Sequence, residues 1–140
     1  MSSDKLIAVC ALVLLAGCPL SNGTGSDCKN DGECSGGDVC ARDGVCTESS
    51  QVRQVTATWT IRGAAANVMT CGTNEDLYLS FIGNDSGDTL GFSPVPCRIG
   101  QFLVDKLPTR FRQVELGVEG GTRDVKPIDG GGTAALDLRL

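Results

Sequence analysis

The hydrophobic pattern divides the chain into four segments. Residues 1–17 contain an apolar run, and residues 18–27 are mostly small and polar. Residues 28–46 carry evenly spaced cysteines, and residues 51–140 alternate between apolar and polar positions. We therefore expect a leader, a flexible tether rich in glycine and serine, a cysteine-rich module and one folded domain, in that order.

The alternation in the last segment predicts β-strands. In "VTATWTIR" the apolar residues Val55, Ala57, Trp59 and Ile61 are separated by threonines, which is typical of a strand with one buried face. Trp59 belongs to this apolar set, so we expect it in the core rather than on a sugar-binding platform with Tyr78. Similar runs occur at residues 77–82, 89–92, 100–107, 110–118 and 134–140.

Six to eight such strands predict an all-β fold, a small antiparallel β-sandwich. Pro94 and Pro96 are expected to end the strand at residues 89–92. The stretch "GTRDVKPIDGGGT" predicts a hairpin turn with a glycine tip, and "GAAANVMTC" has room for one short helical turn.

The apolar run near the start predicts a secretion signal. Leu6 to Gly17 are uncharged and follow Lys5, and twelve residues are too few for a membrane-spanning helix of about 20. The sequence Leu15-Ala16-Gly17-Cys18 resembles the lipobox of bacterial lipoproteins. That resemblance implies cleavage before Cys18, attachment of acyl chains such as palmitate to Cys18, and, with Pro19 next, anchoring in the outer membrane.

The cysteines fit an oxidising compartment. Cys28, Cys34, Cys40 and Cys46 are six residues apart with glycine-containing turns between them, so two disulfides close a segment with too few apolar residues for a core. Three pairings are possible, and we favour Cys28–Cys40 with Cys34–Cys46.

Cys10 is removed with the leader, and Cys18 carries the lipid. Once the four evenly spaced cysteines are paired, Cys71 and Cys97 remain, and we expect them to pair with each other. The even spacing argues against a zinc site, since zinc ligands usually come in close pairs. We interpret the acidic residues of these turns as solvated. A calcium site is a less favoured alternative, either at Asp31, Glu33, Asp38 and Asp43 or at Asn84, Asp85 and Asp88.

Two further resemblances concern these segments. Residues 28–46 are loosely similar to small EGF-like or Dickkopf-like modules. Leu107-Pro108 and the strands around them look like the prealbumin-like sandwich of carboxypeptidase-regulatory and CnaB-type domains. Some members of that group carry Lys–Asn cross-links, but nothing in the sequence marks Lys106 or Lys126 as a partner.

Composition narrows the function. The net charge of −5 and the lack of a Lys/Arg cluster argue against nucleic-acid binding. The chain has no histidine, which is the commonest general base of enzymes. We expect no cofactor or metal and no catalytic residues. The expected role is non-enzymatic, binding or structural, in a lipid-anchored protein of the cell envelope whose partner is an envelope protein or glycan. The alternative is an envelope enzyme or a carbohydrate-binding accessory module.

Overall fold

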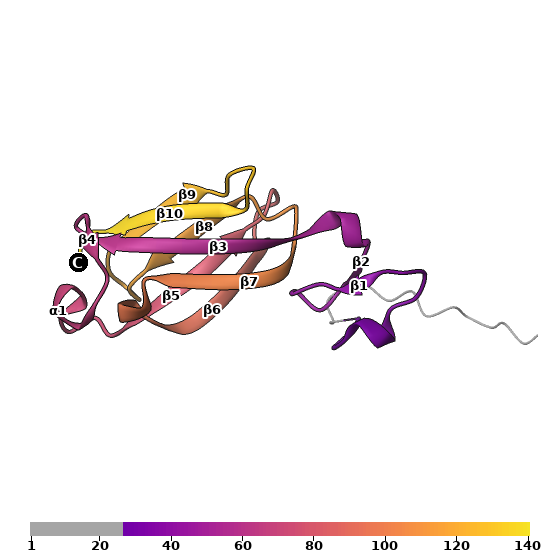
Figure 1. Cartoon of the computed structure of the whole chain (residues 1–140), viewed down its shortest axis with the longest axis horizontal. Helices are drawn as coiled ribbons and strands as arrows, with labels where there is room; N and C mark the ends of the chain where they lie inside the picture. Colours follow the sequence, from indigo (N-terminus) through magenta and orange to yellow (C-terminus); the bar gives the residue numbers. More distant parts are fainter. Residues whose placement is uncertain (1–26) are drawn as a thin grey trace, which may run out of the picture.

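The computed structural model describes residues 27–140. The expected leader, most of the tether and Cys18 lie outside these residues. Figure 1 shows two parts, a small loop-rich module and an elongated body made of strands. No helix of the described residues is long and apolar enough to cross a membrane.

The module consists of short elements held by two disulfides. Its strands pair in an antiparallel ribbon, with Cys40 opposite Cys46. The elements are the 3-10 helix η1 (Asp31–Glu33) and the strands β1 (Val39–Cys40) and β2 (Cys46–Thr47). A second 3-10 helix, η2 (Ser49–Gln51), leads directly into the first strand of the body.

The body is a β-sandwich of two four-stranded sheets, as the alternation predicts. All strand pairs are antiparallel except that of β10 with β3, which is parallel. The first sheet contains β3 (Val52–Ile61), β4 (Ala64–Ala65), β7 (Gln101–Pro108) and β10 (Thr133–Leu138). The second sheet contains β5 (Asp76–Ile82), β6 (Thr89–Pro96), β8 (Gln113–Gly117) and β9 (Arg123–Pro127).

The core lies between the two sheets and uses the apolar positions of the alternation. On β3, Val55 and Ala57 are fully buried and Trp59 is 4% exposed, while the threonines between them are partly exposed. Leu79 and Phe81 on β5 and Leu116 on β8 are also fully buried. The core cluster includes no residue of the module, so the module must be held by other contacts.

The prediction that Pro94 and Pro96 end the strand at residues 89–92 is wrong for Pro94 and right for Pro96. β6 continues through Pro94 and ends at Pro96, and it is an outer strand of its sheet. The register shifts between Leu77 and Leu79 of the neighbouring β5, so Pro94 falls in a bulge. An outer strand with a bulge tolerates prolines because the missing N–H groups are not needed for pairing there.

The prediction of a hairpin at residues 121–133 is also wrong. Residues 123–127 form β9, which pairs with β8, and the chain then crosses to the other sheet, where β10 pairs with β3. The side chain of Asp129 shapes the crossing by accepting hydrogen bonds from the backbone N–H groups of Gly131 and Thr133, at 2.9 and 2.7 Å. Local turn residues indicate a reversal but do not say which sheet the next strand joins.

Candidate functional site

The module contains the disulfide pairing that we favoured among the three possibilities. Cys28 bonds to Cys40 and Cys34 to Cys46, with Cα–Cα distances of 5.7 and 5.5 Å. The two bridges interleave, because each spans 12 residues and Cys34 lies inside the first loop. They replace a hydrophobic core in this segment.

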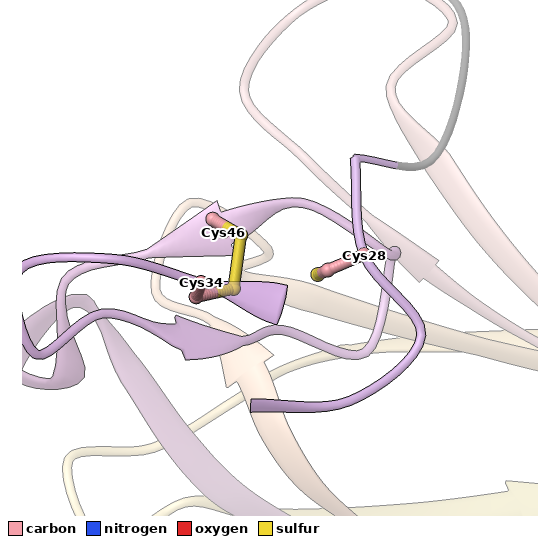
Figure 2. A group of neighbouring side chains, drawn as sticks. All are labelled: Cys28, Cys34 and Cys46. Atoms are coloured by element: carbon pink, nitrogen blue, oxygen red, sulfur yellow. A yellow bond between two sulfur atoms is a disulfide. The ribbon is translucent and has the colours of Figure 1, made fainter. Parts of the chain in front are cut away.

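The two disulfides lie next to each other. The Sγ atoms of Cys28, Cys34 and Cys46 are all within 4.8 Å of one another. Figure 2 shows Cys28 beside the Cys34–Cys46 disulfide. Among the described residues this is the one cluster of three or more side chains of metal-ligand type. Each sulfur is already in a disulfide, however, and metal binding by cysteine requires a thiolate.

A bulge in β7 holds the module against the sandwich. The pairing register of β3 and β7 shifts opposite Asp105 and Lys106, and Lys106 has a positive φ of 50°. In this conformation its Nζ lies 2.7 Å from both carboxylate oxygens of Asp31, and its carbonyl accepts the N–H of Arg42 at 2.9 Å. Bulges commonly redirect side chains in this way.

Two further ion pairs join the module to the sandwich. Arg42 pairs with Asp105, and Arg110 pairs with Asp43 at 2.6 Å. Arg110 also pairs with Asp88 within the sandwich, at 2.9 Å. We call the contact made by Asp31, Arg42, Asp43, Asp105, Lys106 and Arg110 the junction. The interpretation of Asp31 and Asp43 as solvated turn residues missed these partners, which the spacing of acidic residues alone does not reveal.

The junction shifts the pKa of two of its members. The hydrogen bond from Lys106, and then that from the backbone N–H of Cys40, lowers the pKa of Asp31. Burial acts to lower the pKa of Arg110, but the carboxylates of Asp43 and Asp88 outweigh it and raise that pKa. Asp88 therefore already has a cationic partner, which weakens the calcium alternative for the loop that contains it.

The opposite end of the sandwich, which we call the tip, presents apolar side chains to solvent. It contains the short helix α1 (Val68–Cys71) and the 3-10 helix η3 (Cys97–Ile99). Val68 is 67% exposed, Met69 91% and Ile99 49%. This gathering of aliphatic groups is unlike the polar surface expected of a solvated loop.

The tip is rigidly built in spite of its exposure. The side chain of Asn67 caps α1 by accepting the N–H groups of Met69 and Thr70, and the hydroxyl of Thr70 accepts the N–H of Asn67 in return. The Cys71–Cys97 disulfide, present as expected, joins α1 to η3. Such a capping box and a covalent bridge keep the apolar groups in fixed positions.

A cleft of about 170 Å³ lies beside the exposed face of α1. Its walls include Val68, Glu75, Asp76 and Arg98. It therefore combines an apolar side chain with charges of both signs. Residues 63–71 predict the helical turn, but sequence alone does not say that its apolar residues face outward.

The two aromatic residues considered as a sugar-binding platform, Trp59 and Tyr78, make other contacts. Trp59 is in the core, and its Nε1–H donates to the carbonyl of Cys97 at 2.8 Å. Tyr78 donates its hydroxyl to Glu115 at 2.9 Å, and burial, followed by this carboxylate, raises the pKa of Tyr78. Neither ring lies among the exposed apolar residues of the tip.

No protein-family model matches the chain, and no curated protein or solved structure matches it at a significant level.

Proposed function

We propose that this chain is a lipid-anchored protein of the cell envelope that binds another envelope protein through its tip and catalyses no reaction. The anchor is Cys18, and Pro19 favours the outer membrane. Within this proposal the module is an EGF-like or Dickkopf-like spacer and the body a prealbumin-like sandwich. The observation that carries the proposal is the exposure of Val68 and Met69 on a helix fixed by a cap and a disulfide.

The arrangement of the chain supports this role. The described residues begin at the module, and the ten residues of β3 lead from the module to the tip, about 30 Å at the usual rise per residue. A chain anchored before the module would hold the tip away from the membrane surface. The aliphatic character of the exposed groups favours a protein partner over a glycan, because an aromatic platform is lacking among the exposed residues described.

The anchor is tested by replacing Cys18→Ala and measuring the mass of the protein and its membrane fraction. We expect the unlipidated variant to lose its acyl mass and its retention with membranes. Cys10→Ala is the matched control, since it removes a cysteine of the leader and should leave lipidation unchanged. Acylation of the Cys18→Ala variant would refute the anchor.

The binding end is tested by placing a photo-crosslinking residue at position 69 in cells with an intact envelope. We expect a discrete cross-linked protein that disappears when Val68→Glu is added. The control is the same probe at position 103 on β7, where Leu103 is 58% exposed but belongs to neither α1 nor η3. Equal products from both positions, or none from position 69, would contradict the proposed binding end.

A further inference from the structure

We propose that the two disulfides of the module form a thiol-exchange relay, with Cys28 as the nucleophile once an external dithiol opens the Cys28–Cys40 bridge. The proximity of the Sγ atoms of Cys28, Cys34 and Cys46, all within 4.8 Å, is the basis of this inference. The relay is independent of the lipid anchor and of the tip.

The Cys28–Cys40 bridge borders the cleft at the junction, although Cys34 and Cys46 are also partly exposed. A cleft of about 450 Å³ at the junction is lined by Cys28 and Cys40, whereas Cys34 and Cys46 are not part of its walls. Within this bridge Cys28 is only 3% exposed, while Cys40 is partly exposed. Within this bridge an incoming thiolate therefore attacks Cys40 in preference to the buried Cys28, and Cys28 is the leaving group.

The relay consists of three successive thiol–disulfide exchanges. A thiolate of the dithiol attacks Cys40 Sγ, the Cys28–Cys40 bond breaks, and its electron pair stays on Cys28 as a thiolate. The second thiol of the reagent then resolves the mixed disulfide, which releases Cys40 as a thiol and leaves the reagent oxidised. The Cys28 thiolate attacks Cys34 or Cys46, forms a new bridge and expels the other sulfur as a thiolate.

The exchange is linked to the junction. The N–H of Cys40 donates to Asp31 Oδ1 at 2.9 Å, and the same carboxylate binds Lys106. The N–H of Cys28 donates to the carbonyl of Gly44 at 2.9 Å. Moving Cys28 to a new partner removes the bridge that holds these groups together, so the pairing of the sulfurs controls how the module docks on the sandwich.

A matched pair of single variants tests the relay. In Cys40→Ser the free sulfur is Cys28, inside the cluster, and in Cys28→Ser it is Cys40, outside it. Each variant is incubated at mildly alkaline pH, quenched with acid, alkylated and mapped by peptide analysis without reduction. In Cys40→Ser we expect the alkyl label on Cys28, Cys34 and Cys46. In the second variant we expect label on Cys40 alone.

Unfolding of the sandwich should not confuse the result, because its core contains no module residue and should survive both substitutions. Label confined to Cys28 in Cys40→Ser, or equal scrambling in both variants, overturns the proposal. Treating the unaltered protein with one equivalent of dithiothreitol gives a second measurement. We expect a free thiol at Cys40 together with one at Cys34 or Cys46. The proposal is also overturned if the free thiols are only Cys28 and Cys40, or only Cys34 and Cys46.

Discussion

Lys106 and Asp31 are 75 positions apart in the sequence, yet the Lys106 Nζ lies 2.7 Å from both oxygens of the Asp31 carboxylate. This contact exists because a bulge in β7 gives Lys106 a positive φ and points its side chain at the module. The module has no share in the core, so polar contacts of this kind decide its position.

The Asp31 contact makes docking of the module sensitive to acid. The pKa of Asp31 is lower in the folded protein than its ordinary value of 3.8. The contribution of Asp31 to docking is therefore fully present above pH 3.8 and is lost as the pH falls through the lower pKa of the folded protein. We expect Asp31→Asn to reduce the hydrogen-exchange protection factor of the Arg42 amide near neutral pH, with the difference from the unaltered protein vanishing in strong acid. Asp38→Asn is the control, since it removes the same charge outside the junction. Equal protection in all three proteins near neutral pH would contradict this assignment.

Gly132 is expected to tolerate no side chain. It has a φ of 79°, and a Cβ would lie 2.5 Å from the carbonyl oxygen of Gln54. Its own carbonyl accepts the N–H of Thr56 at 2.8 Å, so the backbone has little freedom to move away. We expect Gly132→Ala to lower the free energy of unfolding by about 1–3 kcal/mol in denaturant titrations. Gly130→Ala in the same loop meets no atom within 4 Å and should change it far less; similar losses from both would refute the steric argument.

The Cys71–Cys97 bridge is expected to stabilise the whole sandwich. It closes a separation of 26 residues, for which loop entropy predicts about 3–4 kcal/mol of the free energy of unfolding. Replacing both cysteines by alanine should produce this loss in a denaturant titration while the far-ultraviolet circular dichroism stays that of a β protein. A loss below about 1 kcal/mol would show that the capping box and packing hold the tip without the bridge.

Trp59→Phe tests one buried hydrogen bond together with the packing of the indole ring. Without the indole N–H the carbonyl of Cys97 loses its partner, and we expect a loss of about 1–3 kcal/mol in the free energy of unfolding. Unfolding has to be followed by circular dichroism, because Trp59 is the one tryptophan of the chain. Trp59→Leu, which also removes the ring, should cost more. A Trp59→Phe protein as stable as the unaltered one would show that the bond contributes nothing net.

Much of the fold was predictable from local patterns. The apolar positions of β3 form its buried face because a strand alternates sides at every residue, and the turn residues between the cysteines bring sulfurs within bonding range. Pro94 misled the prediction because the cost of proline depends on whether its strand is central or outer. That position is a property of the assembled sheet.

The all-β class, the buried alternation of β3 and the disulfide-rich character of residues 28–46 all follow from spacing along the chain. Spacing does not reveal that β10 joins β3 in parallel, that Lys106 meets Asp31, that Met69 faces solvent or that two disulfides lie side by side. These relationships join residues far apart in sequence or depend on what covers a surface. Long-range packing, and not local preference, sets them.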